Sequence, residues 1–363
     1  MKELSVLIKP ASSLCNMRCR YCFYADVSEQ RVIPSYGMMS EDVVKTILRR
    51  VKESGAQSVT FAFQGGEPTL CGLSYFEGFV KEAKAVLPHV RVNYSIQTNG
   101  LLLDDAFCAF LKENCFLVGL SLDGYRENHN GFRPDAAGKD TFTRTLATAE
   151  RLRHFGVDFN ILTVVTAPLA KRGEKLWRFY QKNHFEFVQL IPCLAPLSGD
   201  VANEWALTPQ AYADFLKGIF PLWVDALTKG AYISIRLFDN LVRQAFGQMP
   251  EMCGMCGVCS PQFVIEADGG VYPCDFYVLD EYRCGNLSDN SFDEILQEER
   301  MQRFLKPQFP EACKACRFAR FCRGGCKRYR SLYLAKEGYC PYADFLSSCE
   351  KDILRAGRFV FGG

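Results

Sequence analysis

Three cysteines close to the start of the chain are the residues best suited to chemistry. Cys15, Cys19 and Cys22 lie in the stretch CNMRCRYCFY with the spacing C-x3-C-x2-C. Cysteine thiolates bind zinc and iron, and a structural zinc site takes four protein ligands. Three thiolates can instead hold three irons of a cubane cluster and leave the fourth iron open to a non-protein ligand. The spacing therefore predicts an open iron-sulfur cluster, with a zinc site completed by a distant cysteine as the alternative.

The composition also favours chemistry based on sulfur. The 363 residues include 18 cysteines and 4 histidines, so a histidine-based metal centre has few ligands available. No signal peptide opens the sequence, and no apolar run approaches the roughly 20 residues that span a bilayer. We therefore expect a cytoplasmic protein, in which disulfides are rare. The net charge of +2 predicts no nucleic-acid or membrane partner, and a protein, peptide or small-molecule substrate is expected.

Short apolar stretches alternate with helical patterns through the first half of the chain, which is typical of βα units on a parallel sheet. Residues 40–54, for example, begin with a capping serine and carry apolar residues at helical spacing. Six such strands predict an α/β fold with a partial (β/α)6 TIM-type barrel, although an open doubly wound sheet would give a similar pattern. The expected strands are residues 5–9, 59–64, 92–97, 116–123, 158–166 and 187–193.

Polar motifs follow the first four of these strands. The cysteine triplet follows the first strand, and the segments QGGEP (64–68), QTNG (97–100) and SLDG (121–124) follow the next three. The carboxyl ends of barrel strands carry the catalytic loops. We therefore expect these motifs to meet at one end of the barrel, although each of the three segments could be an ordinary turn by itself.

The sequence changes character after about residue 250, where glycine, cysteine and short polar segments dominate. The stretch QFVIEADGGVYPCDFYV predicts a hairpin that turns at residues 268–270, and residues 196–250 predict a mostly helical bridge. We expect two domains, 1–230 and 231–363. The second would be organised by metal ligation and would end in a helix.

The predicted second domain carries regularly spaced cysteines. Eight follow the pattern C-x5-C-x9-G-x4-C, then C-x2-C-x5-C-x3-C and one final cysteine: Cys253, Cys259, Cys274, Cys313, Cys316, Cys322, Cys326 and Cys340. Eight thiolates suffice for two fully ligated four-iron clusters, and a pair of zinc-ribbon sites is the alternative. Cys256 could replace Cys253, and Cys349 could replace Cys340. The other five cysteines are expected to pack as small apolar residues: Cys71, Cys108, Cys115, Cys193 and Cys284.

The triplet followed by an aromatic residue resembles the signature of the radical S-adenosylmethionine (SAM) enzymes, and GGEP at 65–68 is similar to a segment of that family. The resemblance implies that SAM binds the open iron and is cleaved to a 5′-deoxyadenosyl radical, which abstracts hydrogen from an unactivated carbon. Arg133 in HNGFRPD matches an arginine that holds the SAM carboxylate, a task suited to a bidentate donor. The implied SAM contacts are Tyr21, Gly66, Ser121, Arg133 and Leu194.

The later cysteines resemble those of the SPASM domain, which binds auxiliary clusters in peptide-modifying radical SAM enzymes. By analogy, the first auxiliary [4Fe-4S] cluster would be held by Cys253, Cys259, Cys274 and Cys326. The second would be held by Cys313, Cys316, Cys322 and Cys340. Together with the triplet, the resemblance implies three [4Fe-4S] clusters.

Nearly the whole chain resembles the anaerobic sulfatase-maturating enzymes, from LIKPASS through TFAFQGGEP, SIQTNG and VGLSLDG to VYPCDFYVLD. Those enzymes oxidise a cysteine or serine in a sulfatase C/S-x-P/A-x-R motif to Cα-formylglycine. The resemblance implies that Asp275 is the base, and a neighbouring anionic cluster at Cys274 should raise its proton affinity. Tyr24 and Gln64 are expected to contact the substrate. We expect a monomer whose partners are a sulfatase polypeptide and a low-potential electron donor of the flavodoxin or ferredoxin type.

Two other functions are compatible with parts of the sequence. A SPASM enzyme that forms thioether or carbon–carbon crosslinks would share the cysteines. Many such enzymes carry an N-terminal domain for a leader peptide, and a first strand near residue 5 leaves no room for one. A non-catalytic electron carrier or a zinc-stabilised binding module would need neither the GGEP segment nor an open iron. The sulfatase-maturating function is therefore favoured.

Overall fold

The computed structural model describes residues 2–197, 204–330 and 338–361. Its contacts divide the chain into two compact units. The first comprises Met1–Ser121, Asn130–Phe159 and Pro261–Leu305, and the second comprises Leu122–His129, Asn160–Ser260 and Lys306–Gly363. Each unit combines several separate stretches of the chain and is defined by its internal contacts. The units therefore do not test the expected domain boundary between residues 230 and 231, which stays a prediction.

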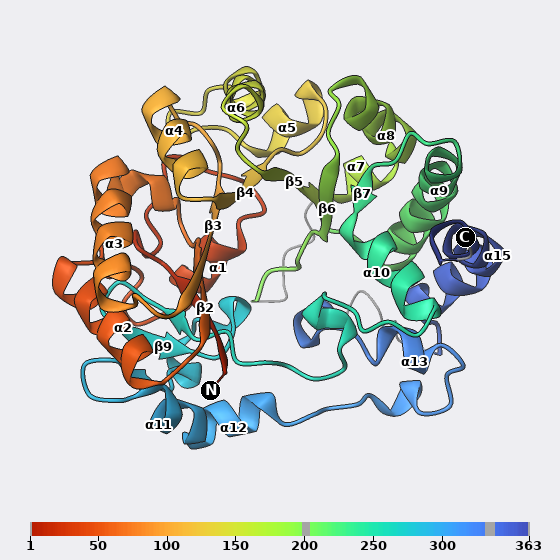
Figure 1. Cartoon of the computed structure of the whole chain (residues 1–363). Helices are drawn as coiled ribbons and strands as arrows, with labels where there is room; N and C mark the ends of the chain where they lie inside the picture. Colours follow the sequence, from red (N-terminus) through yellow and green to blue (C-terminus); the bar gives the residue numbers. More distant parts are fainter. Residues whose placement is uncertain (1, 198–203, 331–337, 362–363) are drawn as a thin grey trace. The chain divides into compact units, whose positions relative to one another are not determined.

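Four parallel strands form the main sheet of the first unit (Figure 1). They are β1 (Glu3–Ile8), β2 (Ser58–Phe63), β3 (Arg91–Thr98) and β4 (Phe116–Ser121). Their β-branched and aromatic residues suit a buried pleated surface. The register pairs Ile8 with Phe63, and Phe63 with Ile96. The carboxyl ends of the first three strands therefore lie side by side.

Two of the helices between these strands begin at residues whose side chains cap them. The side chain of Ser40 accepts a hydrogen bond from the backbone N–H of Val43 at the start of α2 (Glu41–Glu53). Asp104 accepts one from Phe107 in the same way at the start of α4 (Asp105–Glu113). Each cap satisfies a backbone N–H that has no partner inside its helix. The other helices of the unit are α1 (Phe23–Glu29), α3 (Leu73–Val86), α6 (Phe142–His154), α11 (Phe292–Gln297) and α12 (Glu299–Leu305).

A hairpin from much later in the chain extends this sheet on the other side of β1. β8 (Val264–Ile265) pairs in parallel with β1, β9 (Gly270–Tyr272) pairs antiparallel with β8, and β10 (Gly285–Asn286) pairs antiparallel with β9. The predicted turn is confirmed, and Gly269 has a φ of +83°, which glycine adopts without strain. The segment after β9 then contacts α1.

The second unit contains three more parallel strands, β5 (Phe159–Val165), β6 (Phe187–Pro192) and β7 (Ser234–Ile235). Its longest helices, α9 (Pro209–Thr228) and α15 (Pro341–Phe361), pack against each other. The rings of Phe220 and Phe345 meet in that contact, with centroids 5.6 Å apart. Its other helices are α7 (Ala167–Ala170), α8 (Gly173–Lys182), α10 (Arg236–Ala245), α13 (Ala319–Cys322) and α5 (Arg126–Phe132), which contributes to both units.

The α/β class and all six predicted strands are confirmed, as is the C-terminal helix. The predicted bridge over 196–250 is helical in α9 and α10, whereas residues 198–203 lie outside the described residues. Within the part of the chain that the structure describes, no helix has the length and apolar character needed to cross a bilayer.

Candidate active site

The cysteine triplet lies between β1 and α1, where Cys15, Cys19 and Cys22 are all partly exposed. Cys22 directly precedes α1, and its backbone N–H donates to the carbonyl of Cys19 at 3.1 Å. Burial raises the pKa of Cys15 to about 11, and among the neighbouring groups Cys22 also raises it. The two thiols are therefore close enough to interact, as ligands of one cluster must be.

The residue types of the triplet suit a cluster. Three thiolates can hold three irons of a cubane and leave the fourth iron open. The donor set of the triplet, which is sulfur alone, fits an iron-sulfur cluster.

The GGEP loop packs directly against the segment that leads into the triplet. The backbone N–H of Glu67 donates to the carbonyl of Leu14 at 2.8 Å. The buried carboxylate of Glu67 accepts hydrogen bonds from the side chain and backbone of Thr69, from the Thr98 hydroxyl and from the Asn99 N–H, at 2.6 to 3.1 Å. Because Thr69 follows β2, and Thr98 and Asn99 lie at the end of β3 and directly after it, Glu67 holds the ends of both strands beside the triplet.

Gly66 is required by the close approach of this loop to Leu14. Its φ is +54°, and a Cβ at this position would lie 2.2 Å from the carbonyl oxygen of Leu14. We expect Gly66→Ala to weaken SAM binding at least about tenfold, because left-handed backbone and a backbone clash together cost more than about 1.4 kcal/mol. Anoxic calorimetry with SAM would measure this. Gly78→Ala is the control, since a Cβ there meets nothing within 4 Å; equal affinity for both variants would contradict the prediction.

Two of the predicted SAM contacts are brought together in the first unit. The Arg133 guanidinium donates to the Tyr21 hydroxyl at 2.9 Å, and Arg133 is buried. Backbone hydrogen bonds from Arg18 to Pro134 and from Arg20 to Phe132 join the triplet loop to this segment. The remaining predicted contacts follow strands: Gly66 after β2, Ser121 at the buried end of β4, and Leu194 after β6 in the second unit.

Asp275 lies in the first unit directly after Cys274, and it is 8 % exposed. Its Oδ2 accepts hydrogen bonds from the Tyr24 hydroxyl at 2.7 Å and from the Gln64 side-chain amide at 3.0 Å. Its other oxygen, Oδ1, is buried and has no hydrogen-bond partner among the described residues. Burial raises the pKa of Asp275 to about 6, against opposing effects of Tyr24 and Lys9. The carboxylate therefore has one fixed oxygen and one oxygen available to a new donor.

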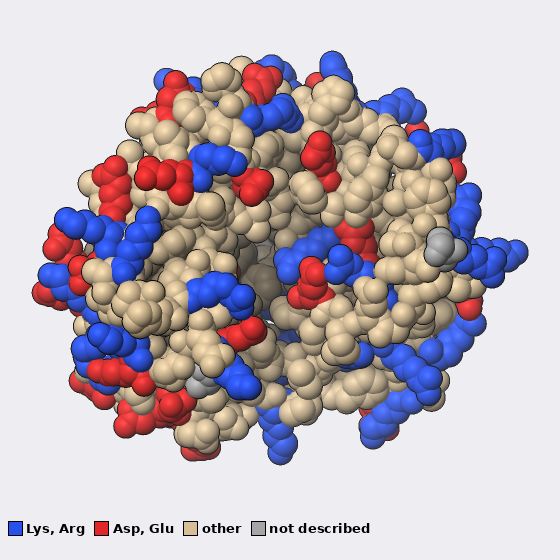
Figure 2. Space-filling model, in the orientation of Figure 1, with Lys and Arg blue, Asp and Glu red and all other residues tan. Residues whose placement is uncertain are grey.

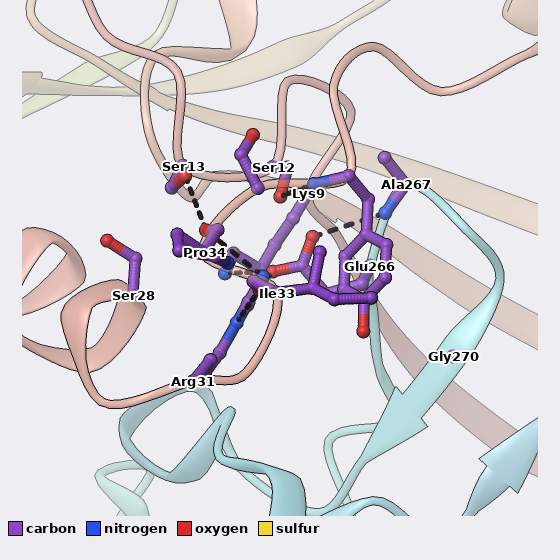
Figure 3. A network of polar contacts seen from close by, with 12 residues as sticks. Lys9, Ser12, Ser13, Ser28, Arg31, Ile33, Pro34, Glu266, Ala267 and Gly270 are labelled. Atoms are coloured by element: carbon purple, nitrogen blue, oxygen red, sulfur yellow. Dashed lines mark hydrogen bonds and ion pairs between the residues drawn. The ribbon is translucent and has the colours of Figure 1, made fainter.

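Lys9, which lowers the pKa of Asp275, belongs to a buried ionic network that was not predicted from the sequence (Figure 3). The Lys9 ammonium, from the residue after β1, donates to Glu266 on the hairpin at 2.6 Å, and Arg31 donates to the same carboxylate oxygen. All three side chains are at most 3 % exposed. The Lys9 ammonium also lies 5.6 Å from the centre of the Tyr24 ring. Its stem lies against Gly65, where a Cβ would come within 2.4 Å of it.

Removing Glu266 should destabilise the first unit strongly. Glu266→Ala leaves the ammonium of Lys9 and the guanidinium of Arg31 buried without an anion, so we expect the free energy of unfolding to fall by about 3–5 kcal/mol. Urea unfolding followed by circular dichroism would measure the change. Glu53→Ala is the control, because Glu53 forms solvent-exposed ion pairs on α2 that contribute little. A Glu266→Ala variant as stable as this control would contradict the prediction.

The cysteines assigned to the second auxiliary cluster gather within the second unit. Burial raises the pKa of Cys322 to about 11, and Cys313, Cys340 and Cys316 all add to the increase. Burial likewise raises the pKa of Cys313, again with contributions from Cys340 and Cys316. The alternative ligand Cys349 is buried in α15, where the groups that affect its pKa, after burial, are Asp352, Lys217 and Asp344. These neighbours support Cys340 as the ligand.

Three of the four cysteines assigned to the first auxiliary cluster also lie in the second unit. Burial raises the pKa of Cys253, and Cys326, Cys259 and Cys256 raise it further. The alternative ligand Cys256 points its thiol toward the carbonyls of Met252 and Pro250, at 3.5 and 3.6 Å. This supports Cys253 as the ligand. The fourth residue, Cys274, belongs to the first unit, so the complete set stays a prediction.

The assignment of Cys340 leads to a test by iron content. After anoxic reconstitution, the wild-type chain is expected to hold about twelve irons, and Cys340→Ala about eight, because the second auxiliary cluster loses a ligand. Cys349→Ala is the matched control and should keep the full complement. Elemental analysis of iron and sulfide would measure all three proteins. A loss of iron from Cys349→Ala with Cys340→Ala unaffected would reverse the assignment.

Comparisons with known proteins agree with this geometry. Residues 10–171 match the radical SAM superfamily, and residues 243–317 match the iron-sulfur cluster-binding domain SPASM. The native structure of anSMEcpe with bound AdoMet and Cp18Cys peptide is 39% identical, with a TM-score of 0.92 over 99% of both chains. Structures of Streptococcus suis SuiB, at 18% identity and a TM-score of 0.63, share the fold.

Curated relatives specify the family further. The cysteine-type anaerobic sulfatase-maturating enzyme of Clostridium perfringens is 43% identical over 334 residues, which cover 91% of this chain and 90% of the relative. The enzyme of the same name from Clostridium novyi is 43% identical over 90% of this chain and 89% of its own. The serine-type enzyme of Bacteroides thetaiotaomicron is 30% identical over 95% and 91%. The chain therefore belongs to the anaerobic sulfatase-maturating enzymes of the radical SAM superfamily.

Proposed function

We propose that this chain oxidises a cysteine in the C-x-P/A-x-R motif of a sulfatase polypeptide to Cα-formylglycine without oxygen. The observation that carries the proposal is the buried Oδ1 of Asp275, a carboxylate oxygen without a partner among the described residues, while Tyr24 and Gln64 hold the other oxygen, Oδ2. Cysteine is preferred to serine in this proposal because the cysteine-type enzyme of Clostridium perfringens is 43% identical and the serine-type enzyme of Bacteroides thetaiotaomicron 30%.

Different residues of the first unit would bind the open cluster and SAM in this reaction. Cys15, Cys19 and Cys22 would hold the open cluster, and the Gly66 backbone with Tyr21 and Arg133 would hold SAM. When bound, SAM and the clusters supply a 5′-deoxyadenosyl radical that takes a hydrogen atom from the substrate Cβ and an acceptor for one further electron. The overall conversion balances as cysteine, SAM and water giving formylglycine, hydrogen sulfide, 5′-deoxyadenosine, methionine and a proton.

Asp275 would act as the general base of this reaction. Its Oδ1 would accept the proton of the substrate thiol, while Tyr24 and Gln64 hold Oδ2 and so fix the carboxylate plane. Proton transfer by a positioned group of this kind contributes about 10²–10⁴ to a rate. The thiolate formed is easier to oxidise than the thiol, which explains why the base must lie at the reacting sulfur.

The proposed partners follow from the reaction. SAM cleavage takes up one electron before oxidation of the substrate releases one, so we include a low-potential donor of the flavodoxin or ferredoxin type that supplies the first electron. We also propose a monomer in the cytoplasm without nucleic-acid or membrane partners. For the face it draws, Figure 2 shows acidic and basic side chains interspersed over the elements of the first unit, without the basic excess that a nucleic-acid partner would favour.

The test is peptide turnover under strictly anoxic conditions. The reconstituted chain, SAM and a chemical reductant would be incubated with a peptide containing C-x-P-x-R, and mass spectrometry would detect the mass change expected when a thiol is replaced by an aldehyde. Matched peptides with serine or alanine at the target position are the controls. A crosslinked product, or release of 5′-deoxyadenosine without aldehyde from the cysteine peptide, would overturn the proposal.

A further inference from the structure

The last part of the chain is basic although the protein as a whole is nearly neutral. Residues 306–330 contain eight lysine and arginine residues and one acidic residue, whereas the full chain has 43 basic and 41 acidic residues. Figure 2 shows basic side chains over the segments of α13 and α15 with few acidic ones between them. This surplus is concentrated in one part of the second unit.

Some of these basic residues have structural roles. The half-buried Arg323 donates to the carbonyl of Cys256 at 3.3 Å, and Arg328 donates to the carbonyl of Ala195 at 2.6 Å. Arg330 donates to the carbonyls of Gly324 and Gln308. Each of these side chains satisfies a backbone acceptor within its own unit. They explain part of the basic composition without any partner.

Five other basic side chains are exposed and have no such role. Arg320, Lys351 and Arg358 form no ion pair with any residue that the structure describes. Lys314 and Arg317 pair only with the exposed acids Glu311 and Glu350. Exposed pairs of this kind contribute little to stability. We call these five residues the basic surface: Lys314, Arg317, Arg320, Lys351 and Arg358.

Contacts within the second unit join the two segments that carry the basic surface. The Arg317 guanidinium donates to Ser347 and Glu350 of α15, both at 3.3 Å. Lys351 follows Glu350, and Arg358 lies seven residues farther along α15, which places the two on the same side of the helix. The charges therefore belong to one region of the surface.

Three residues of the basic surface are neighbours in the sequence of the predicted ligands of the second auxiliary cluster. Lys314 follows Cys313 and Arg317 follows Cys316 in the sequence, and Arg320 lies two residues before Cys322. Cys316 and Cys322 are themselves partly exposed. A cluster held there would be near solvent, beside side chains that attract an acidic protein.

We propose that the basic surface is the docking site of an acidic electron-carrier protein, which delivers one electron to the chain at each encounter. The inference rests on the proposed function, because a chain that cleaves SAM reductively needs such a carrier. The positive charge of the basic surface favours an acidic partner. Because the predicted ligands of the second auxiliary cluster are nearby in the sequence, we expect this partner to be a protein that transfers electrons. Complementary charge acts chiefly on the association rate and makes it depend on salt.

The test measures binding of a flavodoxin to the reconstituted, full-length chain by surface plasmon resonance at several salt concentrations. The triple variant Arg320→Glu, Lys351→Glu, Arg358→Glu should associate about tenfold more slowly at low salt and depend less on salt than the wild type. The control variant Lys45→Glu, Lys81→Glu, Lys171→Glu makes the same change in net charge with exposed residues outside the basic surface, and it should bind like the wild type.

Turnover with two reductants separates docking from the reaction itself. With titanium citrate as the electron source, the triple variant should oxidise the peptide as fast as the wild type, whereas with reduced flavodoxin it should be slower. Unchanged flavodoxin association by the triple variant, an equal loss in the control variant, or tight binding of poly-uridine RNA without binding of flavodoxin would overturn the docking proposal. Failure of the proposed function would instead appear as wild-type inactivity with both reductants.

Discussion

Replacing Cys19 with alanine is expected to abolish formation of 5′-deoxyadenosine, and with it all oxidation of the peptide. Three thiolates are the minimum that holds a cubane with one open iron, and the triplet supplies only Cys15, Cys19 and Cys22 in this loop. Two thiolates leave a second iron without a protein ligand, so the cluster should be lost during reconstitution. Chromatography of the products and iron analysis of the same sample would measure both effects.

Cys115→Ala is the matched control for this loss. Cys115 is an exposed cysteine just after α4 and belongs to none of the predicted ligand sets. Its φ of +52° is retained by an alanine at similar cost, so iron content and product formation should equal those of the wild type. SAM cleavage by the Cys19→Ala chain would refute an open cluster at the triplet, and so would zinc in place of iron in the wild-type protein.

Local sequence patterns predicted where strands and helices form, but they did not predict how the hairpin pairs with the sheet. Apolar, β-branched runs predicted β1 to β6 correctly, and the capping residue Ser40 predicted the start of α2. The parallel pairing of β8 with β1 involves two residues on each strand, Leu7 with Val264 and Ile8 with Ile265. A pairing so short and so distant in sequence leaves no periodic signal, because periodicity reports only local geometry.

The same limit explains which site residues were found. Tyr24, Gln64 and Asp275 were predicted from a family resemblance, and the structure brings them into hydrogen-bond contact across more than 200 residues. Lys9 and Glu266 were missed, because a charged residue is normally interpreted as exposed. The sequence nevertheless contained a sign that each of these two residues is buried. Glu266 interrupts the apolar run FVIEA, and Gly65 provides the space that the Lys9 stem fills.

Asp275→Asn should separate SAM cleavage from aldehyde formation. An asparagine side chain keeps an oxygen that can accept from Tyr24 and Gln64, so the packing around residue 275 should persist. The amide cannot take up the thiol proton, and we expect the aldehyde yield to fall about 100-fold or more, the range of a positioned base. In the presence of peptide, 5′-deoxyadenosine should still form at a rate close to that of the wild type. The ratio of 5′-deoxyadenosine to aldehyde, measured on one sample, reports the effect.

Tyr24→Phe distinguishes the base from the groups that orient it. This variant keeps the carboxylate of Asp275 and its hydrogen bond from Gln64 but loses the one from Tyr24 at 2.7 Å. A hydrogen bond to a charged group contributes about 1.5–3 kcal/mol, so a loosened carboxylate should still act as a base but less often in the correct orientation. We therefore expect an aldehyde yield between those of the wild type and Asp275→Asn. A yield from Asp275→Asn equal to that of the wild type would exclude the carboxylate as the base, since the variant alters no other group at the reacting sulfur.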